Sequence, residues 1–228
     1  MNKYLPPALA IAAMFVGLPS SEAAPIVTLY NTGVDSLGAA LTDDAPDPHY
    51  LLVAGAGAVE TGTPLVVAGG FPINPWMANS ATGAWTGTTA TSALAPIDPS
   101  SGLINLYYET SFSLAGFDPT TAAISFDLAA DNLVSDVLIN GSSTGITQGA
   151  GFGSFESKTL SPGAIALLNG GTNTMTFVVQ TASGGGPDVD YFGLRVEFTT
   201  RTADVIPEPS SLALLGLGSL LGLRRRRP

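Results

Sequence analysis

The chain has 228 residues, of which 45% are hydrophobic and only 11% charged, and its net charge is −10. The absence of cysteine excludes disulfides and thiolate metal sites, and the single histidine excludes a two-histidine metal site. An acidic chain lacks the basic stripe that binding to nucleic acid phosphates needs. The 27 glycines and 17 prolines exceed their usual share and leave an acidic, turn-rich, mostly β protein.

The N-terminus has the layout of a secretory signal. A single lysine precedes an apolar stretch, and small residues follow it. The small residues before Ala24 suit signal peptidase, so we predict that residues 1–23 form a signal helix that is removed by a cut after Ala23. A cut after Ala24 would place Pro25 beside the scissile bond, which is a poorer arrangement. A short transmembrane anchor is the alternative.

An acidic loop follows, with Asp43, Asp44 and Asp47 between prolines. Oxygen ligands this close together can bind calcium. Their spacing matches no ordered calcium loop, so we expect a solvated loop with no metal and keep calcium as the alternative. His49 has no second histidine or cysteine to join it, and we expect a structural role for it.

Two tryptophans, Trp76 and Trp85, lie in a polar segment that resembles a loop. Large aromatic rings on a surface can stack on sugar rings, which makes both residues candidates for ligand binding. A tryptophan in a β protein more often packs over the edge of the core with its N–H hydrogen-bonded. Packing is therefore the expectation, and stacking on a ligand is the alternative.

Apolar residues alternate with polar ones in four segments, which is the pattern of strands with one buried face. These segments are 106–114, 122–128, 174–180 and 191–198. Further strands are predicted at 50–54, 64–68, 134–139 and 152–159. Four clear alternations favour antiparallel sheets, and the regular spacing of the strands favours an all-β sandwich of the jelly-roll type over residues 24–204.

Two local signals refine this pattern. Asn140-Gly141 after an apolar run predicts a tight hairpin turn. Ser161 followed by Pro162 predicts a short helical turn, with serine as the N-cap and proline in the first helical position.

Asp131 and Asn132, with Asp136, fall between two predicted strands. Their oxygens could bind calcium or a sugar hydroxyl, but such side chains commonly bond their own backbone and shape a turn, which we favour. No motif of a serine hydrolase, zinc protease or nucleotide-binding loop is present. Nothing brings two of Glu109, Glu156 and Glu197 together as a glycosidase pair. The chain is therefore expected not to be an enzyme.

The C-terminus has three parts in order: Pro207-Glu208-Pro209, an apolar run over residues 212–223, and an arginine cluster made of Arg224, Arg225, Arg226 and Arg227. At ~1.5 Å per residue, a helix of this run would be roughly 18 Å long. A hydrocarbon core is ~30 Å thick, so the predicted short transmembrane helix suits transient anchoring better than a permanent span. The arginines would hold its end on the cytoplasmic side.

This three-part block, over residues 205–228, resembles the PEP-CTERM sorting signal of Gram-negative bacteria. In that family the tripeptide is recognised by an exosortase, a membrane-embedded protease, and the proteins occur with exopolysaccharide and biofilm matrix. The resemblance implies signal peptidase and exosortase as partners, and exopolysaccharide as a further candidate. It also implies transient anchoring in the inner membrane, followed by release to the cell surface or the extracellular space.

The order of features in the central segment also resembles galactose-binding-like jelly rolls, including those of carbohydrate-binding modules. The pair Asp131-Asn132, followed by a strand that ends at Asn140-Gly141, carries this resemblance most clearly. In those modules loops at one end of the sandwich hold the ligand, often a sugar, and calcium is sometimes structural. No sugar-contacting residue can be carried over by position.

Three hypotheses follow for the mature protein: a non-catalytic surface or matrix component, a carbohydrate-binding protein that uses loop aromatics, and, most remotely, a glycan-cleaving enzyme. Removal of both ends leaves three basic and 16 acidic residues, a net charge near −13. Such acidity favours solubility and attracts cations. It argues against binding an anionic polysaccharide by charge attraction alone.

Overall fold

The computed structural model describes residues 22–56, 61–67, 76–89, 104–149, 151–181 and 191–206. All of them belong to the unit Glu22–Ile206. The predicted signal helix and the predicted C-terminal transmembrane helix lie outside the described residues, as do the Pro-Glu-Pro motif and the arginine cluster. Within the described ranges, no helix is long and apolar enough to cross a membrane.

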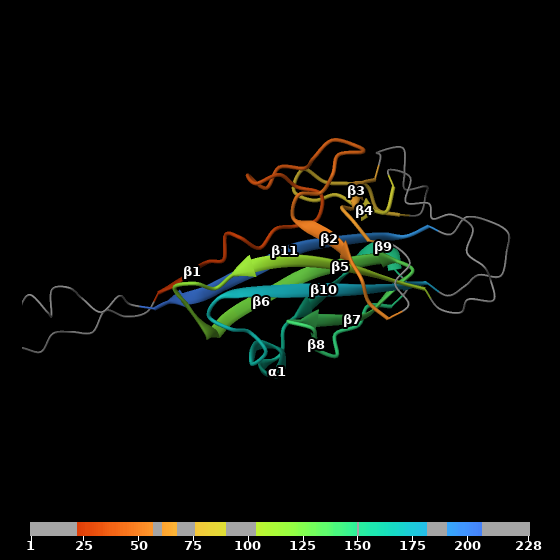
Figure 1. The fold of residues 1–228 in the computed structure, drawn as a ribbon. Coiled ribbons are helices and arrows are strands. Elements are labelled where there is room, and N and C mark those ends of the chain that lie inside the picture. Colours follow the sequence, from red (N-terminus) through yellow and green to blue (C-terminus); the bar gives the residue numbers. More distant parts are fainter. Residues whose placement is uncertain are drawn as a thin grey trace, which may run out of the picture. The chain divides into compact units, whose positions relative to one another are not determined.

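The strands form two antiparallel sheets (Figure 1), which confirms the predicted all-β antiparallel class. The first sheet has the order β3-β4-β11-β6-β9, and β1 also pairs with β11. Its strands are β1 (Ala23–Pro25), β3 (Leu65–Val66), β4 (Thr86–Gly87), β6 (Phe117–Asp131), β9 (Gly151–Thr159) and β11 (Gly193–Val205). The second sheet has the order β2-β5-β10-β7-β8, with β2 (Tyr50–Val53), β5 (Ile104–Ser113), β7 (Leu133–Ile139), β8 (Ser142–Ser143) and β10 (Thr172–Thr181).

The long strands alternate between the two sheets along the chain. β5, β7 and β10 lie in the five-stranded sheet, whereas β6, β9 and β11 lie in the six-stranded sheet. Strands that follow one another in sequence therefore face each other across one core. The result is a sandwich-like arrangement of two sheets.

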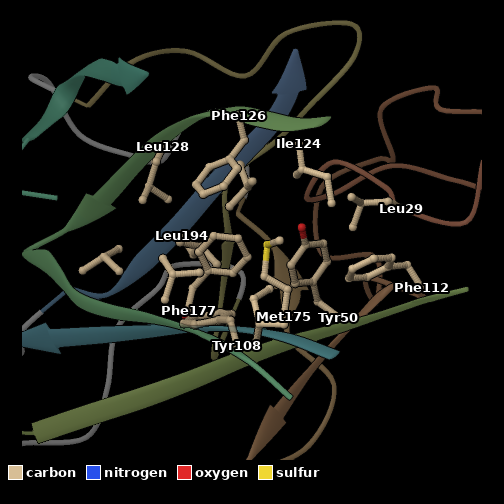
Figure 2. Packing of buried hydrophobic residues seen from close by; sticks show 14 of the residues in the cluster. Leu29, Tyr50, Tyr108, Phe112, Ile124, Phe126, Leu128, Met175, Phe177 and Leu194 are labelled. Carbon is tan, nitrogen blue, oxygen red and sulfur yellow. The ribbon is translucent and has the colours of Figure 1, made fainter. Parts of the chain in front are cut away.

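The core lies between the inner faces of these sheets (Figure 2). Phe126 from β6 meets Phe177 from β10 edge to face, with 5.6 Å between the ring centroids. This geometry is a favourable one for aromatic pairs. The predicted alternation is confirmed in all four segments, since the following residues are buried: Leu106, Tyr108, Phe112, Ile124, Phe126, Leu128, Met175, Phe177, Val179, Phe192, Leu194 and Val196.

Both local signals in the sequence are confirmed. Ile139 pairs with Ser142, so Asn140 and Gly141 form a two-residue turn, and both have positive φ (50° and 77°) as a type I′ turn requires. The short helix α1 (Pro162–Ile165) begins after Ser161, whose side chain accepts a hydrogen bond from the Ala164 N–H.

Other elements differ from the prediction. β11 continues to Val205, seven residues beyond the predicted end at Phe198, and β6 begins at Phe117, not at Ala122. These extensions carry mostly threonine, alanine and aspartate, so apolar alternation does not detect them. β1, β4 and β8 are two or three residues long and were not predicted.

Candidate functional site

The two ends of the described unit meet where β1 pairs with β11 (Figure 1). In this register Ala23 lies opposite Asp204. The Val205 N–H donates to the Glu22 carbonyl oxygen at 3.1 Å, and the Ile206 N–H donates to the Gly116 carbonyl oxygen at 2.8 Å. We call this region, made of Glu22, β1, Gly116, Val205 and Ile206, the exit end. The chain is therefore hydrogen-bonded up to the residue before Pro207.

The predicted signal peptidase site lies in β1. A cut between Ala23 and Ala24 would leave Ala24 opposite Ala203 and Pro25 opposite Thr202. Proline is tolerated here because β1 pairs with β11 alone in the described sheet and is therefore an edge strand. No strand was predicted for this segment, because its residues were assigned only to the processing site.

The second region is an aromatic cluster on the outer face of the six-stranded sheet. Trp85 has 0% exposed surface, and its Nε1–H donates to the Met77 carbonyl oxygen at 2.9 Å. Its ring packs beside Trp76, with 4.5 Å between the ring centroids. Because no face of its indole is exposed, Trp85 packs against the sheet and has no surface on which a sugar ring could stack. We call Val67, Trp76, Met77, Trp85, Ala129, Phe152 and Phe155 the tryptophan cluster.

Trp76 is half-buried and bonds a residue far away in sequence. Its Nε1–H donates to Asp131 Oδ2 at 2.8 Å, and Asp131 itself is only 7% exposed. The structure thus joins two of the candidate ligand-binding residues, but their polar atoms bond each other. Asn132 follows Asp131 through a cis peptide bond. Sugar binding at Trp76, Asp131 and Asn132 stays the untested alternative.

A buried arginine and a partly exposed glutamate form an ion pair that holds the segment carrying both tryptophans. Arg195 on β11 is 3% exposed, and its Nη2 lies 2.6 Å from Glu197 Oε1. The same guanidinium donates to the Ala78 carbonyl oxygen and lies 5.0 Å from the centroid of the Phe155 ring. Glu197 also accepts a hydrogen bond from Ser80. The alternation in residues 191–198 implies that Arg195 lies on the outer face of the sheet, but it does not reveal its burial, because the covering segment is distant in the chain.

The acidic loop does not assemble its three carboxylates into one site. Asp47 is fully buried, and it accepts hydrogen bonds from the Gly33 N–H at 2.7 Å and the His49 N–H at 3.0 Å. Asp43 and Asp44 are exposed. Across the described part of the chain, no group of three or more histidine, cysteine, aspartate or glutamate residues could hold a metal ion. The prediction of a solvated loop is therefore wrong for Asp47. Its buried carboxylate instead accepts hydrogen bonds from the surrounding backbone.

Burial raises the pKa of Asp47 from 3.8 to about 6, although the backbone hydrogen bonds from Gly33 and His49 lower it. The folded state therefore binds this proton more tightly than the unfolded state. The stabilising effect of that proton is full below pH 4 and is lost as the pH rises to about 6. We predict a loss of about 3 kcal/mol in the free energy of unfolding across this window, since one pKa unit corresponds to about 1.4 kcal/mol.

Urea denaturation at several pH values checks this prediction, with Asp47→Asn as the comparison. Asparagine cannot titrate, and it has one acceptor oxygen fewer at every pH. The comparison is therefore between the slopes of the free energy of unfolding against pH, and not between its absolute values. His49 acts in the opposite direction, because burial lowers its pKa, and its effect is present in both proteins. Identical slopes for wild type and Asp47→Asn would contradict the prediction.

All three basic residues between Ala24 and Ile206 have polar partners. Lys158 Nζ lies 2.8 Å from Glu156 Oε2, Arg195 is buried against Glu197, and Arg201 donates to the Leu29 carbonyl oxygen. The excess negative charge on this unit is therefore not balanced by free cations. This arrangement disfavours contact with an anionic polymer.

The three candidate glutamates lie on three different strands. Glu109 lies on β5 and accepts a hydrogen bond from Thr176, whereas Glu156 and Glu197 lie on the other sheet, on β9 and β11. Each carboxylate has its own hydrogen-bonding partner. This geometry lends no support to a glycosidase pair.

Residues 205–227 match the family model described as the PEP-CTERM protein-sorting motif. The C-terminal segment of this chain carries that sorting motif. The match begins at Val205, the last residue of β11, so the matched region starts within the exit end. Such a motif implies recognition by an exosortase and export to the cell surface. No curated protein and no solved structure has significant similarity to the chain.

Proposed function

We propose that this protein is an exported, non-catalytic component of the cell surface or extracellular matrix of a Gram-negative bacterium. Signal peptidase removes its N-terminal segment, the short apolar run holds it in the inner membrane, and an exosortase then processes it near Pro207-Glu208-Pro209. The observation that carries this proposal is the match of residues 205–227 to the sorting motif.

Two features of the described unit favour this proposal over glycan cleavage and over carbohydrate binding. Its carboxylates at Glu109, Glu156 and Glu197 are each bonded to a neighbouring side chain. The aromatic residues that were candidates for ligand binding pack against the sheet, and Trp85 has no exposed surface. No described contact favours carbohydrate binding as a second function. The proposed role in the biofilm matrix rests on the sorting motif alone.

The sorting step predicts a specific defect when the tripeptide is changed. Replacing Pro207, Glu208 and Pro209 with alanine removes the recognition element but leaves the apolar run and the arginines intact. We expect the variant to accumulate in the membrane fraction at the unprocessed size, whereas the wild type reaches the surface or the medium at a smaller size. Immunoblots of cell fractions from the natural host measure both properties.

Deletion of the host exosortase should reproduce the phenotype of the alanine variant. A control variant with alanine in place of Ser210 and Ser211 should be processed like the wild type, since the tripeptide stays intact. An identical size and location of the wild-type protein with and without the exosortase would contradict the proposed sorting. Intact mass of the recovered protein then locates both ends of the mature chain.

A further inference from the structure

Both processing segments leave the folded unit from one end. Glu22 and Val205 share a hydrogen bond, and Ala23 lies opposite Asp204 in the β1–β11 register (Figure 1). The residues before Glu22 and after Ile206 therefore start from neighbouring points. The basic flanks of both apolar segments, a lysine in front and four arginines behind, are on the cytoplasmic side by the positive-inside rule. Both segments would then meet the same face of the membrane.

The connection between the exit end and the apolar run is short. Five residues, 207–211, separate Ile206 from Leu212, and two of them are prolines. At the ~3.1 Å per residue of extended proline-rich chains, a segment of five residues reaches roughly 15 Å. The polar layer on each side of a bilayer takes up about 5–8 Å of that length. The tethered unit therefore has its exit end within about 10 Å of the membrane surface.

Exposed apolar side chains gather at this end. Val205 and Ile206 are 42% and 52% exposed. Val27 is 69% exposed, and it lies between Ile26, which donates to the Arg201 carbonyl oxygen, and Thr28, which accepts from the Ser113 N–H. It is thus near the final residue of β5, but it lies beside β11 four residues before that strand ends. Exposed apolar groups beside a lipid tether are suited to the boundary between headgroups and acyl chains.

We propose that the exit end is a membrane-facing surface, whose partner is the lipid headgroup layer, for as long as the C-terminal run anchors the chain. This inference rests on the proposed function. β11 has 13 residues and is about 40 Å long at ~3.3 Å per residue, so the opposite end of the unit points away from the lipid. That opposite end includes Asp131 and Gly193, which pair where β6 ends and β11 begins. The tether therefore orients the protein as well as holding it.

The contact between the exit end and the lipid headgroups depends on anchoring by the C-terminal apolar run. Asp204 places a carboxylate at the exit end and pairs with Asp118 in the register of β11 and β6, so this end stays acidic after signal peptidase has removed Glu22. Acidic side chains are repelled by anionic lipids. Charge attraction to anionic lipids would therefore not hold the protein at the membrane after proteolysis near Pro207.

Two alanine positions provide a matched test in a chain without cysteine. Ala115 is exposed in the β5–β6 turn, beside Gly116 at the exit end, and Ala54 is exposed after β2, at the level of the first residues of β5. Ala115→Cys and Ala54→Cys each introduce one thiol into the chain that remains after removal of residues 1–23, so that the C-terminal run is its membrane anchor. Each variant is labelled with bimane and reconstituted in phosphatidylcholine vesicles that carry a nitroxide on the headgroup.

We expect the nitroxide to quench the label at position 115 and to leave the label at position 54 unchanged. Detergent solubilisation should abolish the difference. A third variant, with a long Gly-Ser insertion between Ile206 and Pro207 in the Ala115→Cys chain, should lose the quenching, because a flexible linker frees the unit from the surface. Flotation with the vesicles is measured in each sample as an independent readout of anchoring.

Equal quenching at both positions in a chain that floats with the vesicles would overturn the membrane-facing surface but leave the sorting proposal intact. A blue-shifted emission at position 115 without quenching would indicate a protein neighbour, and it would overturn the lipid partner. A chain that does not float with the vesicles would overturn this inference together with the anchoring step of the proposed function.

Discussion

Replacing Glu197 with alanine is expected to lower the free energy of unfolding by about 3 kcal/mol or more, because it leaves the buried guanidinium of Arg195 without its counter-ion. Arg195 is only 3% exposed, and Glu197 accepts hydrogen bonds from both Nε and Nη2. The remaining protein acceptor, the Ala78 carbonyl oxygen, cannot neutralise the charge. Urea denaturation, with tryptophan fluorescence as the signal, measures the change.

The chain contains a matched control for this experiment. Lys158 and Glu156 form the other ion pair found among the described residues, again two residues apart on one strand, but their side chains are 22% and 41% exposed. Glu156→Ala should therefore cost less than about 1 kcal/mol, as exposed ion pairs do. Equal effects of Glu197→Ala and Glu156→Ala would contradict the buried role of Arg195.

A double variant separates charge from packing. Arg195→Met combined with Glu197→Gln removes both charges and keeps most of the volume. Apolar replacement of a buried ion pair is often close to neutral, so the double variant should be more stable than Glu197→Ala alone. A double variant as unstable as the single one would show that the hydrogen bonds to Ala78 and Ser80, and not the charge balance, hold the covering segment.

The second large effect is expected for Gly193→Ala. A Cβ atom at this position would lie 2.7 Å from the Trp76 ring and 3.1 Å from the Trp85 ring. Both rings are held in the tryptophan cluster, so the methyl group has no free space. Overpacking of this kind typically costs about 1–3 kcal/mol. We expect a loss in that range and a change in tryptophan emission in the folded state.

Fluorescence is a specific reporter here, because the chain has only two tryptophans and both contact this glycine. Gly170→Ala is the control: its Cβ would have no neighbour within 4 Å, and its φ does not lie in the left-handed region. This control should leave both stability and emission nearly unchanged. Unaltered stability and emission in Gly193→Ala would contradict the close packing of the two indoles on β11.

The sequence predicted the parts of the fold that local pattern determines. The face of β5 that carries Leu106, Tyr108 and Phe112 is buried as the alternation requires, since the period of two is a property of any strand with one buried face. The turn at Asn140-Gly141 is equally local, because glycine and asparagine tolerate the positive φ that a two-residue hairpin needs. The sorting motif was also readable, since it is a contiguous block.

The sequence could not predict which distant residues meet. The Trp76–Asp131 hydrogen bond joins residues 55 apart, and the Arg195–Ala78 hydrogen bond joins residues 117 apart. Both depend on the segment around residues 76–85 folding over the outer face of the six-stranded sheet. For this reason Trp85 was kept as a candidate ligand platform although it is buried, and Asp47 was expected in a solvated loop although it bonds two backbone N–H groups.

By itself, the sequence determined the all-β antiparallel class, the positions of the long strands and the sorting signal, because each depends on residues that are adjacent or two apart. Only the tertiary structure decided that β1 pairs with β11 and that the two ends of the unit therefore emerge together. The reason is that strand pairing is set by hydrogen bonds between segments about 180 residues apart, such as Glu22 and Val205, and no local pattern encodes their meeting.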